Sequence, residues 1–160
     1  MEVVSSAMGP KVLDAYRKRG FDCMCGNLRM ASRALTTIYD EHLRSSGLTS
    51  NQLSLLWPIV AMEPTPMSDI ARSVLMDKTT VSRNIAGLEA LGFVEVRSGD
   101  DARIRLVSTT AKGRHAFAAA MPAWEAAQAE IAKTFGKTRF AALVKESKKL
   151  ARTVAARAGS

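Results

Sequence analysis

Cysteine and histidine are scarce in this sequence, which has two of each among its 160 residues. Because Cys23 and Cys25 are its only cysteines and are separated by a single residue, the sequence excludes a framework of structural disulfides. Thiolate metal sites usually space their cysteines about two to four residues apart and add further ligands, and only His42 and His115 are available for that role. We therefore expect no structural disulfide and no metal.

Long apolar runs are also absent. No run approaches the roughly 18 residues that a membrane-spanning helix needs, and the N-terminus lacks the basic-then-apolar order of a signal peptide. We therefore expect a protein that does not enter the membrane and that stays in the cytoplasm. A hydrophobic content of 47% still suffices for a packed core, and the length suits roughly one domain.

Acidic residues are outnumbered, since 15 Asp and Glu face 23 Lys and Arg and leave a formal charge of +8. This balance favours an anionic partner, and nucleic acid is the first candidate. The central residues 68–114 nevertheless hold eight basic and six acidic residues, a net charge of only +2. A prediction of DNA binding therefore depends on where the charges lie.

Helical patterns dominate the first third of the chain. Residues 1–20 are expected to form an arm or a short helix. Apolar residues spaced three and four apart then predict one long amphipathic helix over residues 21–46, which Gly47 ends. Thr49 and Gln52 match the capping-box pattern, in which a hydroxyl and an amide satisfy each other's free backbone N–H groups. They predict the start of a second helix.

The middle of the chain changes from helical to strand periodicity. The stretch at residues 63–66 contains two prolines and predicts a turn, and helical patterns at 68–75 and 78–91 follow it. Beyond them the apolar period changes to two, which predicts paired strands over 93–97 and 103–108 around a Gly-containing turn.

Two helices close the chain. Thr110 is placed to cap a long helix, which Pro122 must kink or divide, and a last helix follows it. The sequence therefore predicts a mainly α fold with a small β-hairpin, in which a winged helix-turn-helix domain is flanked by N- and C-terminal helices.

The predicted helix over residues 78–91 has a core side and a polar side. Val81, Ile85 and Leu88 stack on the core side. The polar side presents hydroxyls, small side chains and one guanidinium, so nothing bulky blocks close approach to a DNA major groove. The alternative is an ordinary solvated helix surface. On this helix we assign to DNA the residues Lys78, Thr79, Thr80, Ser82, Arg83 and Asn84.

Three arginines, Arg97, Arg103 and Arg105, bracket the turn of the predicted hairpin. A hairpin tip of this kind can insert an arginine into the narrow, strongly negative minor groove, and Asp101 can orient one arginine by pairing with it. The alternative is a solvated hairpin edge. We include all four residues in the predicted DNA-binding surface.

The run MDKTTVSRNIAGLEALGFVEVRSGDDARIRLVSTTAKGR resembles the recognition helix, wing and following helix start of the MarR family of transcriptional regulators, and GLTSNQLSLLW is similar to the same family. Thr109 stands where the family usually has an apolar residue. The resemblance implies an obligate homodimer whose terminal helices, within residues 1–47 and 111–160, interlock, while residues 48–110 bind double-stranded DNA. Two recognition helices about 34 Å apart would read a pseudo-palindromic operator, and a signal would release a repressor of this kind.

The segment CGNLRMASRAL resembles the first helix of the organic-hydroperoxide-sensing branch of that family, with Cys25 at the reactive position and Arg29 where that branch has a tyrosine. The resemblance implies an oxidant signal, because a thiol near a helix N-terminus can have a lowered pKa and react with peroxide. The alternative is that Cys23 and Cys25 are buried hydrophobic residues of a dimer interface. We expect both cysteines to lie on one helix, where their side chains point apart and form no bridge within the chain.

A small-molecule effector is the other signal that the resemblance implies, in the crevice between the dimer helices and the DNA-reading domain. Trp57 and Met62 are candidate lining residues, although apolar residues on a helix more often belong to the core. Such a ligand would act by preferring a dimer whose recognition helices no longer match the groove spacing.

Enzyme motifs are missing from the sequence, which has no phosphate-binding glycine loop, no nucleophile elbow and no His pair at metal spacing. We therefore expect neither an enzyme nor a cofactor. Two alternatives stay open. A thiol peroxidase that uses Cys25 would turn over peroxide, and a winged helix that binds another protein would show little salt dependence in any DNA binding.

Overall fold

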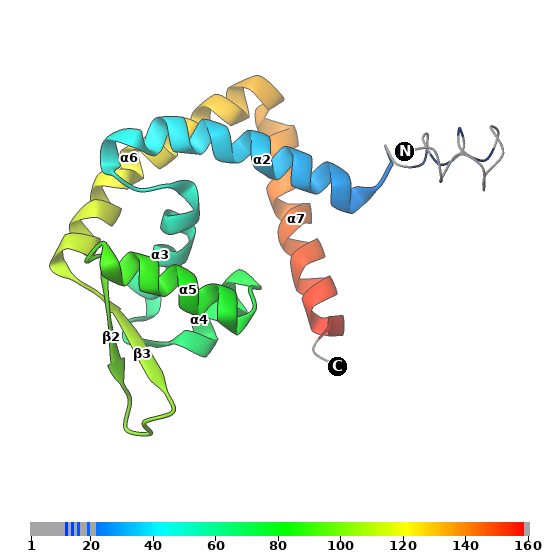
Figure 1. Ribbon diagram of the computed structural model, residues 1–160. Helices are drawn as coiled ribbons and strands as arrows, with labels where there is room; N and C mark the ends of the chain where they lie inside the picture. Colours follow the sequence, from blue (N-terminus) through cyan, green and yellow to red (C-terminus); the bar gives the residue numbers. More distant parts are fainter. Residues whose placement is uncertain (1–11, 13, 15, 17–18, 20–21, 159–160) are drawn as a thin grey trace, which may run out of the picture. The chain divides into compact units, whose positions relative to one another are not determined.

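The structure of the chain is a computed structural model (Figure 1), and it describes residues 12, 14, 16, 19 and 22–158. The predicted arm over residues 1–20 lies outside the described residues except at those single positions, and so does the predicted helix start at Phe21. The chain divides into two compact units, residues 1–38 and 39–160. In the described part of the chain, no helix is both long enough and apolar enough to cross a membrane.

Helix α2 (Met24–Leu43) begins in the first unit and ends in the second. The main-chain carbonyl of Cys23 accepts the N–H of Asn27 at 3.0 Å, so Cys23 precedes the helix as its first flanking residue. A 3-10 turn, η1 (Arg44–Ser46), continues α2, and Gly47 then adopts a left-handed conformation with φ 73°. The predicted end at Gly47 is therefore confirmed, since glycine adopts this conformation at little cost.

Helix α3 (Ser50–Met62) starts at the predicted capping box. The Thr49 hydroxyl accepts the N–H of Gln52 at 3.3 Å, and the Gln52 side chain accepts the N–H of Thr49 at 2.9 Å. The side chain of Asp40 at the end of α2 accepts the N–H of Ser50 at 2.6 Å. The buried side chains of α3 are Leu53, Leu55, Leu56 and Ile59.

The sheet has three antiparallel strands in the order β1-β3-β2. Strands β2 (Val94–Ser98) and β3 (Arg105–Thr109) form the predicted hairpin, and β1 (Thr65–Pro66) adds a short third strand to β3. The prediction of a simple turn over residues 63–66 is wrong for its second half. Two residues carry no periodicity that identifies a strand, and proline is tolerated there because β1 is an edge strand.

Helices α4 (Met67–Val74) and α5 (Lys78–Ala90) form the helix pair that the sequence predicts. On α5, the predicted core residues Val81, Ile85 and Leu88 are all buried. Burial of this apolar row holds α5 against the core and leaves its polar side to solvent.

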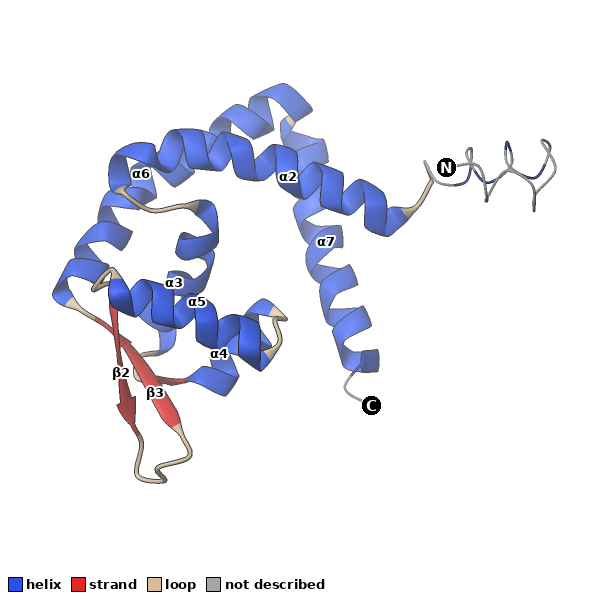
Figure 2. Cartoon of the chain, in the orientation of Figure 1, coloured by secondary structure: helices blue, strands red, loops and turns tan. Residues whose placement is uncertain are grey.

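Helix α6 (Ala111–Phe135) begins at the predicted cap, where the Thr110 hydroxyl accepts the N–H of Gly113 at 3.0 Å. Pro122 lies inside α6, and the helix is continuous through it, so the helix is not divided in two. A single residue separates α6 from α7 (Lys137–Ala158). Figure 2 shows how few strand residues accompany these helices.

Candidate nucleic-acid interface

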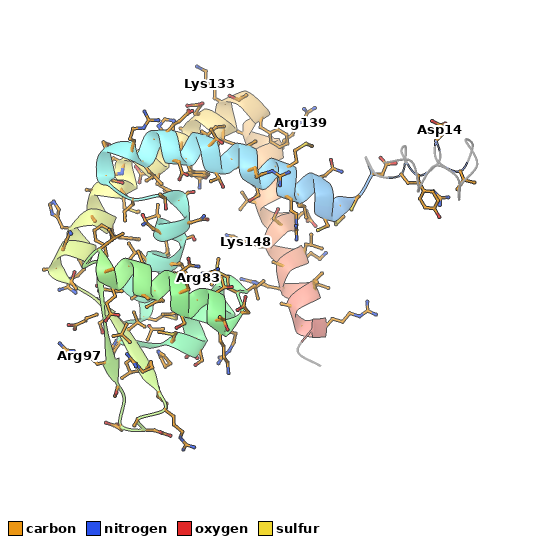
Figure 3. All side chains as sticks on the ribbon, in the orientation of Figure 1. Asp14, Arg83, Arg97, Lys133, Arg139 and Lys148 are labelled. Atoms are coloured by element: carbon orange, nitrogen blue, oxygen red, sulfur yellow. The ribbon has the colours of Figure 1, made fainter. Side chains whose placement is uncertain are left out.

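The polar side of α5 carries the six residues that the sequence assigns to DNA. Four of them are exposed: Lys78, Thr79, Ser82 and Arg83. The other two, Thr80 and Asn84, are half-buried. Arg83, which is labelled in Figure 3, makes no ion pair with any residue that the structure describes. Its guanidinium is therefore available to a base edge or a phosphate. Ala86 and Gly87 continue the exposed side, so the helix stays slender along its length.

Asp77 caps the start of α5 and is a site residue that the sequence prediction missed. Its two carboxylate oxygens accept the N–H of Thr80 at 2.8 Å and the hydroxyl of Thr80 at 2.6 Å. Both hydrogen bonds hold the pKa of Asp77 below its usual value. The cap fixes the first turn, from which Lys78 and Thr79 project. An aspartate at this distance before a helical threonine is itself an N-cap signal that could have identified it.

The tip of the wing, between β2 and β3, is ordered by a forked ion pair. Arg103 Nε lies 3.1 and 3.2 Å from the two carboxylate oxygens of Asp101, and Arg103 Nη2 lies 2.9 Å from the second of them. The Arg103 N–H also donates to Asp101 at 2.9 Å. The side-chain bond and the main-chain bond from Arg103 lower the pKa of Asp101, and the same side-chain bond raises that of Arg103. The suggestion that Asp101 orients an arginine is confirmed. Arg103 itself lies in the turn, not on the strand predicted for it.

One hollow of about 240 Å³ brings the start of α5 and the wing together. Its basic lining residues are Lys78, Arg103 and Arg105, and its remaining lining residues are Pro66, Met67, Ser68 and Ile104. Three of the cations assigned to DNA from separate parts of the sequence therefore share one concave surface. Helix α4 contributes Met67 and Ser68, which the sequence prediction did not include.

Arg97 lies apart from this hollow. It pairs with Glu95 on the same strand, with Nη2 3.0 Å from a carboxylate oxygen, and both residues line a different hollow of about 500 Å³ with Glu63 and Arg114. The structure therefore does not bring Arg97 together with Lys78 and the other wing arginines.

Glu63 and Thr109 form a link beneath the wing that the sequence prediction also missed. One carboxylate oxygen of Glu63 accepts both the N–H and the hydroxyl of Thr109, each at 2.6 Å. Arg114 approaches the other oxygen at 3.6 Å. Burial alone raises the pKa of Glu63, but the bonds from Thr109 and the charge of Arg114 together lower it. These bonds explain how a buried threonine fits at a position where the family pattern has an apolar residue.

Both cysteines are exposed in this chain. Cys25 lies in the first turn of α2 and Cys23 just before it, so the expectation that both lie on one helix is wrong for Cys23. Arg29 is also exposed, one turn beyond Cys25. Among the described residues, no group of three or more His, Cys, Asp or Glu side chains could hold a metal ion.

Trp57 lines an apolar hollow of about 390 Å³, and its ring packs against Phe117 and Trp124 at centroid distances of 5.4 and 5.2 Å. The other residues of this hollow are Tyr39, Leu43, Ser50, Leu53, Ser54 and Trp124. Burial raises the pKa of Tyr39, whose hydroxyl donates to Gln128 at 2.6 Å. Met62 is exposed and does not line the hollow. Of the two predicted lining residues, Trp57 therefore lines this hollow and Met62 does not.

Comparison with known proteins agrees with this architecture. The profile of the MarR family matches residues 46–104, which contain α3 to the wing tip. The M. tuberculosis transcriptional regulator MosR, solved in complex with DNA, is 36% identical to this chain with a TM-score of 0.68, and the match covers 81% of this chain and 98% of that chain. The chain belongs to the MarR family.

Two further relatives of this MarR-family chain show how far the likeness extends. YwoH of Bacillus subtilis (strain 168), an uncharacterized HTH-type transcriptional regulator, is 31% identical over 83 residues, which are 52% of this chain and 61% of that protein. A mutant MarR from E. coli, solved with operator DNA, shares the fold at 19% identity and a TM-score of 0.72, covering 79% of this chain and 92% of that chain. The predicted winged-helix fold and the predicted family are confirmed.

Proposed function

We propose that this MarR-family regulator binds duplex DNA as a homodimer and reads a pseudo-palindromic operator. Residues 48–110 supply the reading surface, and the helices within residues 1–47 and 111–160 join the two copies. Two-fold symmetry sets the two α5 helices about 34 Å apart, one turn of B-DNA. In this proposal the protein represses transcription and catalyses no reaction.

The shared hollow between α5 and the wing carries the proposal. A helix in the major groove and a wing in the neighbouring minor groove must contact the duplex together, so their cations must face the same partner. Lys78, Arg103 and Arg105 meet this condition because they line one concave surface. Arg83 adds a guanidinium on the exposed side of α5 that pairs with none of the residues that the structure describes. The placement of these cations on one surface thus compensates for the small net charge of residues 68–114.

Two relatives support duplex DNA as the partner. The structure of MosR is a complex with DNA, and that of the mutant E. coli MarR is a complex with operator DNA. MosR shares 36% of its residues with this chain over nearly its whole length. We infer the same class of partner for this chain.

Exposed apolar side chains on two helices support the homodimer. On α7, Leu143 and Val154 are 45% and 58% exposed. On the part of α2 in the first unit, Met24 and Leu28 are 64% and 40% exposed. Monomeric proteins rarely leave extended apolar faces in water. A second copy of the chain that covers these faces would remove the apolar side chains of α2 and of α7 from water.

We further propose that a signal releases the DNA. For an organic hydroperoxide, the Cys25 sulfur attacks the outer peroxide oxygen, so that an S–O bond forms while the O–O bond breaks. The thiol is oxidised to a sulfenic acid, and the peroxide is reduced to an alcohol, which takes up the thiol proton. The exposure of Cys25 supports this access. For a small molecule, the apolar hollow beside Trp57 is the candidate site.

Selection of bound duplexes from random DNA, with and without dilute organic hydroperoxide, tests function and signal together. We expect enrichment of an inverted repeat and lower recovery in the presence of the peroxide. Failure to enrich any sequence in dilute buffer would overturn the DNA-binding proposal. Equal recovery of DNA with and without peroxide would exclude an oxidant as the signal and leave the small molecule as the proposed signal. Consumption of many equivalents of peroxide in the presence of a reductant would instead favour a thiol peroxidase.

A further inference from the structure

Helix α7 carries most of the excess positive charge of the chain. Its residues 137–158 include seven Lys and Arg and a single acidic residue, Glu146, which leaves +6 of the formal +8. The central residues 68–114, which include α5 and the wing, have a net charge of +2. Most of the charge that predicts an anionic partner therefore lies outside the surface described above.

Four of the basic residues of α7 occupy one side of the helix. We call this set the α7 basic face, and its members are Lys145, Lys148, Lys149 and Arg152. Steps of three, four and seven residues along an α-helix bring side chains into a single row. All four side chains are exposed, and none forms an ion pair with the part of the chain that the structure describes. Lys148, near the middle of the row, is labelled in Figure 3.

The apolar side of α7 points the other way. At about 100° per residue, the mean direction of Leu143, Leu150 and Val154 is roughly opposite to that of the α7 basic face. A second copy that covers the apolar side therefore leaves the basic face in solvent. The two sides of α7 can serve different partners at the same time.

The chemistry of the α7 basic face fits a polyanion with regularly spaced charges. Lysine is a compact charge on a flexible stem and needs no fixed bidentate partner. Seven residues of helix span about 10 Å, along which duplex DNA presents one phosphate charge per roughly 1.7 Å of axis. A protein partner would need aromatic or apolar anchors. The residues that share this side with the cations are the small Thr138, Ala141 and Ala156.

We propose that the α7 basic face binds the phosphate backbone of the duplex that α5 and the wing read. The contact is independent of base sequence and adds affinity through release of counterions. This proposal rests on the proposed function, because it takes duplex DNA as the partner. It adds a second DNA-binding surface, on a helix assigned above only to dimerisation.

The test compares variants that change the charge equally. The face variant replaces the four residues of the α7 basic face with glutamine. The control variant replaces four exposed basic residues elsewhere with glutamine: Arg44, Lys133, Arg139 and Arg157. A third variant changes the three lysines of the face to arginine and so keeps the charge. Circular dichroism and sedimentation confirm that each variant keeps the helix content and oligomeric state of the parent.

Binding to a duplex of about 40 base pairs of arbitrary sequence is then measured over a range of salt concentrations. At about 0.15 M salt we expect the face variant to bind roughly tenfold or more weakly than the control variant. The plot of log affinity against log salt should lose roughly three units of slope, and the arginine variant should bind like the parent. Equal losses in the face and control variants would overturn the proposal, because only total charge would then matter.

Further results distinguish the α7 proposal from the proposed function and from binding to a membrane surface. If the parent does not bind duplex DNA at any salt concentration, the proposed function fails as well. If the parent binds and Arg83→Ala weakens binding while the face variant does not, the proposed function stands and the α7 proposal is wrong. Vesicles that contain phosphatidylserine test a membrane surface. Vesicle binding that the face variant loses, without any loss of DNA binding, would overturn the proposal in favour of a lipid partner.

Discussion

Glu63 and Thr109, which are 46 residues apart in the sequence, are joined by two hydrogen bonds of 2.6 Å to one carboxylate oxygen. Glu63 follows α3, and Thr109 ends β3 at the base of the wing. Arg114 of α6 extends the link, since its guanidinium donates to the main-chain oxygen of Thr109 at 2.7 Å. A single carboxylate therefore ties the wing to the two helices beside it.

This link should make part of the folding stability depend on pH. The folded structure lowers the pKa of Glu63, so the stabilisation is present above the ordinary glutamate pKa of about 4.3 and is lost as the pH falls through the lower folded value. Glu63→Gln should cost about 1–2 kcal/mol at neutral pH, because the amide still accepts from Thr109 but no longer attracts Arg114. Urea unfolding of the parent and variant at several pH values measures this. Exposed Glu125→Gln is the control, and a variant with the full acid sensitivity of the parent would contradict the assignment.

A side chain at Gly113 should destabilise the fold for steric reasons. A Cβ at this position would overlap the main-chain oxygen of Phe93, and backbone cannot move aside as a side chain can. We expect Gly113→Ala to destabilise the fold by about 2–3 kcal/mol. Gly87 on α5 is the matched control, because a Cβ there meets no atom within 4 Å. Gly87→Ala should stabilise the fold by up to about 1 kcal/mol. Similar melting temperatures for the two variants would refute this packing.

The Asp101–Arg103 pair should matter for DNA binding through geometry more than through charge. Asp101→Ala removes a negative charge from the wing but also frees the arginine that the carboxylate orients. We expect its affinity for the selected operator to fall several-fold. Asp100→Ala makes the same change of net charge on a neighbouring exposed carboxylate, and we expect it to bind as well as the parent or better. Fluorescence anisotropy measures both, and a gain of affinity in both variants would show that the pair does not position the arginine.

Cys25 should determine the response to an organic hydroperoxide. We expect dilute peroxide to release DNA from the parent but not from Cys25→Ser, because serine forms no sulfenic acid. Cys23→Ser should respond like the parent, since the proposed reactive sulfur is retained. Gel shifts with and without peroxide, followed by a thiol reductant, report the release and its reversal. Equal release from the parent and Cys25→Ser would discard the redox switch.

The features that could be predicted from the sequence have local signals. The capping box of Thr49 and Gln52 involves residues three apart, and the core row of α5 follows one helical period. Strand β1 could not be predicted, because its partner Val107 on β3 lies far along the chain from Thr65. The Glu63–Thr109 link was missed for the same reason. Cys23 was misplaced because a helix start has no strong signal without a capping side chain.

Binding by Arg83→Ala and the parent to the selected operator and to an unrelated duplex, as the salt concentration rises, tests the central claim most directly. We expect the parent to prefer the operator and to lose affinity steeply with salt, as a protein that displaces counterions from phosphates does. Arg83→Ala should lose about 1–3 kcal/mol on the operator and much less on the unrelated duplex. A parent that ignores both duplexes in dilute buffer, or an Arg83→Ala variant that keeps the full preference for the operator, would contradict the claim that this side of α5 reads DNA.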